Sequence, residues 1–405
     1  MLTTSAMVIA AWIILGVAAF ALLLFGVGIA ATWRHTRRTP ALTAELPPVS
    51  LLKPLKGLED QLEANLESFF TQDYPHFEVV IATVDADDPA LRVARSVAAR
   101  HPHVPVRFVV SDDAFGLNPK VANLSGALRA VSHDLIHQSD GNVRVGPGYL
   151  RRIVGEFVAA DASILTSVVV GVGERSVGAA LENLQLSAYI APAMCLALEA
   201  ANITCVCGKS MLLRKSELEE EFGGLESVRN VLCEDFVLGE RYKAAGKTVL
   251  LSSTTVQNVN VDCGADRFFA RHSRWLKMRI TLHLPGFCAD LLSNPIGLSA
   301  IAVVVSGFDW RVALAAAGVW TVKTLADQLA LRFTRAPFPL RYVWLSLVKD
   351  LALVPLWVFA IFSRTVVWRG RKLRFGKDTR LVPVADALAD AALADAHPIV
   401  ADRRA

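Results

Sequence analysis

The chain has 405 residues, of which 53% are hydrophobic and 20% are charged, and its formal net charge is +4. Soluble domains average about 45–50% apolar and about 25% charged residues, so we expect part of this chain to lie in a membrane. The small net charge and the lack of an aromatic and basic stripe exclude nucleic acid as a partner. Six cysteines without a CxxC pair indicate neither a zinc site nor a disulfide framework, and predict a reducing, cytosolic environment.

The first element is an uncharged apolar stretch over residues 7–31. About 20 apolar residues cross a bilayer as a helix, so this stretch is predicted to span the membrane. A cleaved secretion signal is the alternative, but the stretch is too long for a signal-peptide core. Arg34, His35, Arg37 and Arg38 follow at once, and the positive-inside rule then places the rest of the chain in the cytosol.

The next segment alternates short apolar runs with amphipathic stretches. Strands are predicted at 49–55, 77–85, 104–112 and 134–140, with helices at 60–72, 88–101 and 121–132. Strands that alternate with helices of ~10–15 residues predict an α/β domain with a doubly wound, mostly parallel sheet. In such sheets ligands bind at the carboxyl ends of the strands.

Acidic residues follow two of these predicted strands. Asp85, Asp87 and Asp88 come after the second strand, and Asp140 comes after the fourth. A single acid at such a place is more often a turn or helix cap than a ligand. Carboxylates beside a nucleotide-sugar diphosphate make sense if they hold Mg²⁺ or Mn²⁺, which would neutralise the leaving group.

Two further clusters follow along the chain. Glu234 and Asp235 precede a predicted helix that ends at Gly246; they either cap it, or one of them is a general base for an acceptor hydroxyl. In a helix over 270–283, Arg271, Arg274 and Trp275 share one face. Such a face can bind phosphate and a sugar, or it can grip anionic lipid beside the membrane.

The C-terminal third is apolar again, with candidate spans at 287–306, 309–331 and 343–363. They are interrupted by charges that each cost about 2.5–3.5 kcal/mol at a helix centre, and that we expect to snorkel, to pair or to line a lipid-binding groove. These residues are Asp290, Lys323, Asp327, Lys349 and Asp350. Three full spans would place the basic stretch after residue 363 outside the cytosol. Either one of these segments is re-entrant or interfacial, or the positive-inside rule does not hold for this chain.

These clusters resemble a known family in their order and in their flanking residues. Asp-Asp-Pro-Ala at 87–90, Ser-Asp-Gly-Asn at 139–142, Glu-Asp at 234–235 and Arg-His-Ser-Arg-Trp at 271–275 are similar to the D1, D2, D3, RxxRW series of inverting GT-A glycosyltransferases. The flanks resemble the ceramide glucosyltransferase family, glycosyltransferase family 21. They are SLLKPLKGLE (50–59), LNPKVANL (117–124), CVCGKSMLLRK (205–215) and WRGRKLRFG (368–376).

The resemblance implies roles for particular residues. Asp235 is implied as the catalytic base. Donor binding is implied for Asp88, Asp140, Lys53, Arg271, Arg274 and Trp275. Asp140 is also the expected ligand of Mg²⁺ or Mn²⁺, although Asn142 stands where a second carboxylate occurs in the wider GT-A pattern. Cys207 and Glu234 are expected to face the acceptor, with 182–207 as an interfacial, acceptor-facing element.

The sequence therefore predicts an integral membrane enzyme with a cytosolic GT-A domain and transmembrane helices at both ends. The expected parts are an anchor and basic segment (1–46), the catalytic domain (47–285), C-terminal transmembrane or interfacial helices (286–365) and a basic, then Ala/Asp-rich tail (366–405).

The predicted reaction transfers glucose from UDP-glucose to ceramide or a similar lipid, with inversion and at the bilayer. One alternative is transfer of N-acetylglucosamine or another hexose to a hopanoid or other polar lipid, and another is a processive polysaccharide synthase. A non-enzymatic receptor or small channel gives the strand-end acids no role. The Ala/Arg-rich composition favours a bacterial inner membrane.

Overall fold

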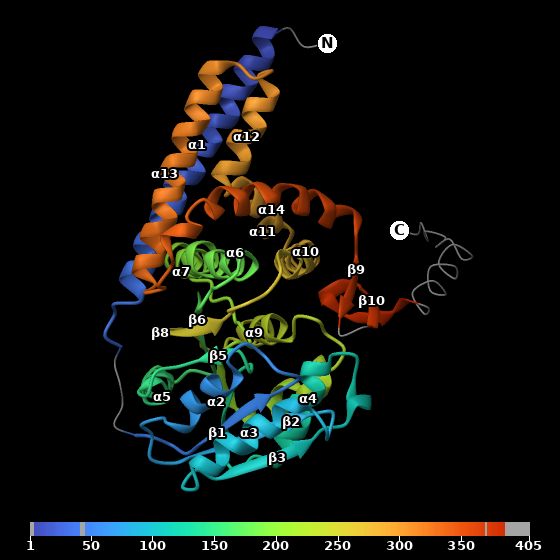
Figure 1. Ribbon diagram of the computed structural model, residues 1–405. Helices are drawn as coiled ribbons and strands as arrows, with labels where there is room; N and C mark the ends of the chain where they lie inside the picture. Colours follow the sequence, from blue (N-terminus) through green and yellow to red (C-terminus); the bar gives the residue numbers. More distant parts are fainter. Residues whose placement is uncertain (1–3, 41–44, 369–370, 385–405) are drawn as a thin grey trace, which may run out of the picture.

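The computed structural model describes residues 4–40, 45–368 and 371–384. Figure 1 shows an α/β domain below and a bundle of long helices above it. The predicted Ala/Asp-rich tail after residue 385 lies outside the described residues, as do residues 369 and 370 within the predicted basic segment.

An eight-stranded mixed sheet forms the centre of the α/β domain, in the order β3-β2-β1-β4-β7-β6-β8-β5. β1 to β4 run parallel to one another, and β7 is antiparallel to both β4 and β6. The strands are β1 (Val49–Pro54), β2 (Phe77–Thr83), β3 (Val106–Val110), β4 (Leu135–Gln138), β5 (Val143–Arg144), β6 (Ile164–Val172), β7 (Met211–Arg214) and β8 (Val249–Val259). The predicted doubly wound, mostly parallel α/β class is confirmed.

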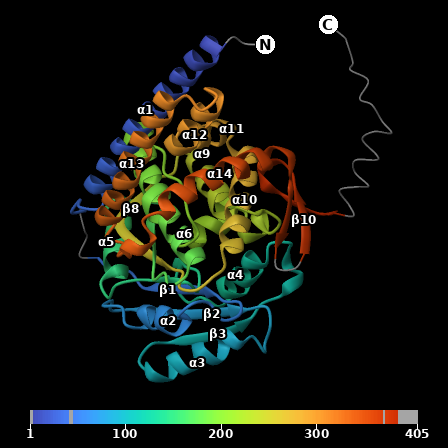
Figure 2. The same ribbon diagram turned by 45° about the horizontal axis from the view of Figure 1, so that its top comes forward.

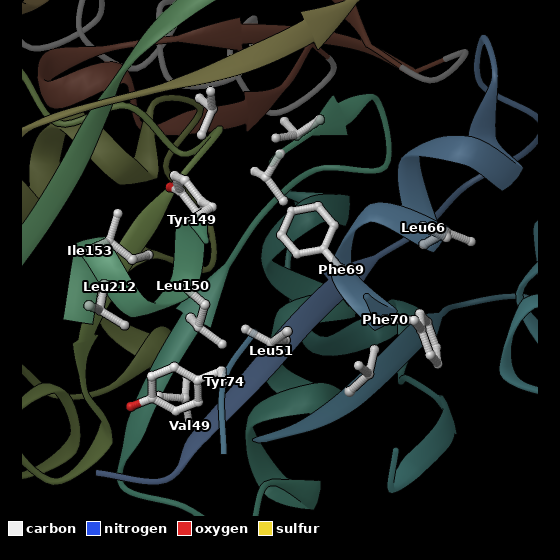
Figure 3. Close-up of a cluster of buried hydrophobic side chains, with 14 of the residues drawn as sticks. Val49, Leu51, Leu66, Phe69, Phe70, Tyr74, Tyr149, Leu150, Ile153 and Leu212 are labelled. Carbon is white, nitrogen blue, oxygen red and sulfur yellow. The ribbon is translucent and has the colours of Figure 1, made fainter. Parts of the chain in front are cut away.

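Helices cover both faces of this sheet, which is why its central strands are apolar throughout. One face carries α2 (Leu62–Phe70), α3 (Pro89–Arg100) and α5 (Tyr149–Ala159), and the other carries α4 (Pro119–Ala130), α8 (Lys215–Phe222) and α9 (Glu234–Ala244). Figure 3 shows part of the first core, where Leu51 of β1 lies near Phe69 of α2 and Leu150 of α5.

A long helix leads from the sheet domain to the bundle. It consists of α6 (Val177–Gln185), the π-helical turn η2 (Leu186–Ile190) and α7 (Ala191–Ala201). Next come α10 (Ala265–Leu282), α11 (Leu284–Leu292), α12 (Pro295–Val305), α13 (Trp310–Phe333) and α14 (Leu345–Phe362). In Figure 1, α1 (Thr4–His35), α12 and α13 stand side by side, while α14 lies across the base of this bundle; Figure 2 shows the same group from another side.

Three described helices are long and apolar enough to cross a membrane: Ser5–His35, Val177–Ala201 and Leu340–Phe362. The predicted span at 287–306 is two helices, Leu284–Leu292 and Pro295–Val305, bent by 66°, which pass the same test together. The predicted span at 309–331 forms α13, but α13 is not among the helices that pass, because Lys323 and Asp327 lower its hydropathy. Half of the most apolar window in Val177–Ala201 is buried (50%), against 28% in each of the other two helices, so more of this helix packs against the protein.

A small antiparallel sheet follows α14 and returns to the α/β domain. Its strands are β9 (Thr365–Trp368), β10 (Arg371–Phe375) and β11 (Leu381–Pro383). The Leu232 N–H donates to the Thr379 carbonyl at 3.0 Å, and the Leu381 N–H donates to the Asn230 carbonyl at 2.7 Å. The segment up to residue 383 therefore lies directly beside the loop that precedes Glu234.

Candidate active site

Lys53 of β1 and Asp140, two residues after β4, meet at the carboxyl edge of the sheet. The Lys53 Nζ donates to the Asp140 backbone carbonyl at 2.8 Å and lies 3.8 Å from the centre of the Phe69 ring. Burial lowers the pKa of Lys53 to about 7, although the charges of Asp140 and Glu59 act in the opposite direction. The residues predicted as donor-binding at these two strand ends are thus brought together.

The Asp140 carboxylate is held by two more lysines. Its Oδ1 lies 3.2 Å from Lys120 Nζ, and its Oδ2 lies 2.9 Å from Lys209 Nζ. Burial alone would raise the pKa of Asp140, but the charges of Lys120 and Lys209 outweigh burial and hold this pKa well below its usual range. Asp140 therefore stays ionised between the two lysines.

Lys120 joins the Asp140 cluster to the Glu-Asp pair. Its Nζ lies 3.0 Å from Glu234 Oε1, and the Asn118 Nδ2 donates to Glu234 Oε2 at 3.2 Å. Asn118 also caps α4, since its side chain accepts from the Lys120 and Val121 backbone N–H groups with Pro119 in the first turn. Burial raises the pKa of Glu234, and the Lys120 charge partly offsets this.

Asp235, the predicted base, lies beside this cluster at the start of α9. Its Oδ2 accepts the Gly208 backbone N–H at 2.6 Å, and its Oδ1 accepts the Phe236 N–H at 2.8 Å. A Cβ at Gly208 would lie 2.5 Å from Lys120 Nζ and 3.0 Å from Asp235 Oδ2, so a larger residue there would displace the Lys120 ammonium. Two backbone donors therefore hold the Asp235 carboxylate in one orientation.

α10 supplies the predicted Arg and Trp side chains. Arg271 Nη1 pairs with Glu182 Oε2 at 3.1 Å, and Trp275 makes an edge contact with His272 at 5.1 Å between ring centres. Burial, helped by the nearby Arg271 charge, lowers the pKa of Arg274 to about 10. Within the described chain Arg274 makes no ion pair, so this partly buried cation can bind an anionic ligand.

The two remaining predicted residues have their own partners. Both Asp88 oxygens accept the Gly57 N–H at 2.9 Å, and Oδ1 also accepts the Ala90 N–H, which caps α3. Cys207 donates its N–H to Thr166 Oγ1 at 3.1 Å, and burial raises the pKa of its thiol to about 12. Donor binding by Asp88 and acceptor contact by Cys207 and Glu234 stay predictions, and Glu234 faces the Lys120 cluster here.

Lys120 and Lys209 were missed as functional residues by the sequence analysis. Both lie in segments that carry the family resemblance, LNPKVANL and CVCGKSMLLRK, but neither lies near Asp140 in the sequence. A signal was present, because each lysine interrupts a segment whose neighbours are mostly apolar. Lysines are almost never fully buried unless they are paired.

Asp140 and Asn142 are the oxygen donors at the predicted metal position. Lys209 Nζ lies 2.9 Å from Asp140 Oδ2 and 2.8 Å from Asn142 Oδ1, so both oxygens already face one positive charge. Among the described residues, no three His, Cys, Asp or Glu side chains form a metal-binding group. Mg²⁺ needs only one or two carboxylates when substrate phosphates complete its shell, so the residues fit a cation shared with a diphosphate.

Together these groups can perform a defined kind of chemistry. Lys53, Lys120 and Lys209 concentrate positive charge at one edge of the sheet, where a diphosphate leaving group would gain negative charge. Asp235 offers an oriented carboxylate within the same network. The arrangement suits transfer of a group from a diphosphate ester to a hydroxyl.

Comparison with known proteins identifies similar glycosyltransferases in both sequence and structure. The sequence model of "Glycosyl transferase family 21" matches residues 12–381. Ceramide glucosyltransferase 1 of Caenorhabditis elegans is 25% identical over 365 residues, which cover 86% of this chain and 78% of that protein. The ceramide glucosyltransferase of Komagataella phaffii is also 25% identical, over 84% of this chain and 85% of that protein. Among solved structures, the mannosyltransferase PcManGT from Pyrobaculum calidifontis in complex with GDP-Man and Mn²⁺ aligns with a TM-score of 0.48 at 15% identity, covering 86% of this chain and 99% of that one.

Proposed function

The chain belongs to glycosyl transferase family 21, and from this premise we propose that it transfers glucose from UDP-glucose to ceramide or a similar membrane lipid, with inversion. The resemblance stated from the sequence motifs is confirmed by the family match, and the chain is a glycosyltransferase. The observation that carries the proposal is the Lys120 bridge: it pairs with both Asp140 and Glu234, which supports a diphosphate site beside Asp235.

On the donor side, the proposed role of the lysines and arginines is electrostatic. Lys53, Lys120 and Lys209 surround Asp140, and Arg274 adds a cation without an ion-pair partner among the described residues. Preformed positive charge of this kind stabilises the charge that develops on a leaving diphosphate. Mg²⁺ or Mn²⁺ would be held by Asp140 and Asn142 together with the donor, and would neutralise the diphosphate.

On the acceptor side, the proposed base is Asp235. Its carboxylate takes the proton from the primary hydroxyl of the lipid as that oxygen forms a bond to the anomeric carbon. The bond from this carbon to the diphosphate breaks at the same time, and UDP leaves with the electron pair. Attack opposite the leaving group inverts the anomeric centre, and the backbone N–H groups of Gly208 and Phe236 hold Asp235 in position.

We also propose that the α/β domain lies on the cytosolic face of a membrane, with a bacterial inner membrane as the expected one. The basic residues in the last turn of α1 and directly after it support this side by the positive-inside rule. The hydrogen bonds between residues 230–232 and 379–381 support a C-terminal segment on the same side. The proposed domain limits are the predicted ones, with α14 as an interfacial helix across the base of the bundle (Figure 1).

The test is a transfer assay with the purified full chain in nanodiscs. Labelled UDP-glucose and UDP-N-acetylglucosamine are each incubated with ceramide and with total lipid extracts, and the products are separated by thin-layer chromatography. We expect one glucosylated ceramide. An N-acetylglucosamine product on another polar lipid would replace the donor and acceptor assignments, whereas a polymer would identify a processive synthase. A catalytically silent control is the Asp140→Ala variant, provided that it remains folded.

A further inference from the structure

The turn between β10 and β11 lies against the loop that precedes Asp235. This turn is η5 (Lys377–Thr379), and Figure 1 shows the small sheet that carries it below the end of α14. The Thr379 carbonyl accepts the Leu232 N–H at 3.0 Å, and the Thr379 Oγ1 accepts the Cys233 N–H at 3.3 Å. The side chain of Thr379 is completely buried. One residue of the small sheet therefore binds two consecutive N–H groups of the loop.

The backbone of Thr379 lies in the left-handed region, with a φ of 54°. A β-branched residue with such an angle is a genuine outlier. Strained residues of this kind persist only where the surrounding structure holds them, and they cluster at functional sites. Glycine adopts the same angle without strain, whereas threonine adds the Oγ1 acceptor for the Cys233 N–H. The strained residue is thus the one whose side chain holds the loop.

Cys233 links Thr379 to the proposed base. Its Sγ donates to Asp235 Oδ1 at 3.4 Å, the same oxygen that accepts the Phe236 N–H at 2.8 Å. Burial and the charge of Asp235 raise the pKa of the Cys233 thiol, so the thiol keeps its proton and acts as the donor. The path from Thr379 to the Asp235 carboxylate therefore consists of two hydrogen bonds, both made by Cys233.

Apolar packing fixes the small sheet against the same loop. Phe375 and Leu381 of the sheet share one buried cluster with Leu232 of the loop and Met278 of α10. The Asn230 carbonyl accepts the Leu381 N–H at 2.7 Å. Because close-packed interiors leave little free volume, this cluster can hold the turn and the loop in one relative position.

From these observations we propose that Thr379 is a positioning residue for the transfer reaction. Its carbonyl and Oγ1 hold the backbone of residues 232–233, and through Cys233 they orient the Asp235 carboxylate. This assignment rests on the proposed function, because it takes Asp235 as the base. The small sheet that follows α14 is then a working part of the active site.

The experiment compares two substitutions with the full chain in nanodiscs. Thr379→Val keeps the shape of the side chain but removes the Oγ1 acceptor, whereas Thr379→Ser keeps this acceptor. In Thr379→Val we expect kcat to fall about tenfold to a hundredfold, which is the cost of a slightly misplaced catalytic group. The KM for UDP-glucose should stay within about twofold, and Thr379→Ser should restore the wild-type kcat.

Two further variants serve as controls. Thr365→Val in β9 is the matched control, because Thr365 binds Lys277 Nζ through its backbone carbonyl at 3.1 Å, and its kcat should not change. Thr379→Gly covers the case in which Thr379→Val does not fold. Glycine adopts the backbone angle without strain but lacks the acceptor, so kcat should fall as in Thr379→Val. Calorimetry with UDP shows that each variant is folded.

A double-mutant cycle tests whether Thr379 acts on Asp235. In single-turnover transfer, adding Thr379→Val to Asp235→Asn should lower the rate by less than about twofold, because the oriented carboxylate is already absent. An unchanged kcat in folded Thr379→Gly, a further tenfold loss in the double variant, or a loss of UDP affinity that matches the loss of kcat would overturn the inference. Transfer by Asp235→Asn near the wild-type rate, or a wild-type product other than glucosylated ceramide, would instead overturn the corresponding part of the proposed function.

Discussion

The sharpest prediction concerns Asp235→Asn, whose effect can be divided into a structural and a chemical part. Both Asp235 oxygens accept backbone hydrogen bonds, from Gly208 at 2.6 Å and from Phe236 at 2.8 Å. An asparagine side chain has one acceptor oxygen, so its amide NH₂ must face one of these two N–H donors. The substitution therefore removes a hydrogen bond as well as the negative charge.

The two parts have different magnitudes and different readouts. A lost hydrogen bond that leaves a buried donor open costs about 1–3 kcal/mol of folding free energy. Loss of a general base lowers the rate by about 10²- to 10⁴-fold, which corresponds to about 3–5 kcal/mol in the activation barrier. We therefore expect a modest loss of thermal stability and a large loss of turnover.

The assay measures single-turnover transfer from labelled UDP-glucose in nanodiscs, together with UDP affinity and thermal unfolding. The matched control is Glu234→Gln at the neighbouring carboxylate, which pairs with Lys120. We expect Asp235→Asn to bind UDP normally and to lose transfer, while Glu234→Gln loses less. Transfer by folded Asp235→Asn within tenfold of the wild type, or a larger loss in Glu234→Gln, would refute Asp235 as the base.

Three further predictions concern charge and topology. Because Lys53 has a pKa of about 7, its side chain is charged below that pH and neutral above it. We therefore expect the affinity for UDP, measured by calorimetry, to fall as the pH rises from 6 to 8. The Lys53→Met variant should lack this pH dependence. Chelation with EDTA should remove activity, and added Mn²⁺ should restore it. In Lys209→Met, half activation should need less Mn²⁺, because the lysine no longer competes with the metal ion for Asp140. An unchanged Mn²⁺ requirement would contradict the shared site. In a cysteine-free background, Lys377→Cys and Glu219→Cys should react with an impermeant reagent from the same side of the membrane, and labelling from opposite sides would contradict the proposed topology.

The elements of the α/β domain could be predicted because their signals are local. The predicted strand at 49–55 is β1 (Val49–Pro54), and the predicted helix at 88–101 is α3 (Pro89–Arg100). Asp88 and Pro89 start α3 by capping and by a fixed backbone angle, which are properties that neighbouring residues determine. Apolar periodicity then specifies which faces are buried.

The composition of the active site could be predicted only in part, because it depends on contacts between distant segments. Asp140 and Asp235 carried motif signals, but Lys120 and Lys209 reach Asp140 only after the sheet has formed. The four-residue strand β7 (Met211–Arg214), which was not predicted, lies between β4 and β6 and so brings Lys209 to the site. The position of β7 between β4 and β6 depends on distant segments, so no local sequence pattern predicts it.

The charges in the C-terminal helices show how much pairing changes the interpretation of a sequence. Lys323 of α13 lies 2.6 Å from Asp327 and 3.2 Å from Asp350 of α14, and Lys349 also pairs with Asp350. We expected these charges to snorkel, to pair or to line a lipid-binding groove, and the structure shows that they pair. Two lysines and two aspartates give the cluster no net charge, which reduces the penalty of holding it among apolar helices. Because the cluster ties α13 to α14, the charges that weakened the prediction of membrane spans hold these two helices together.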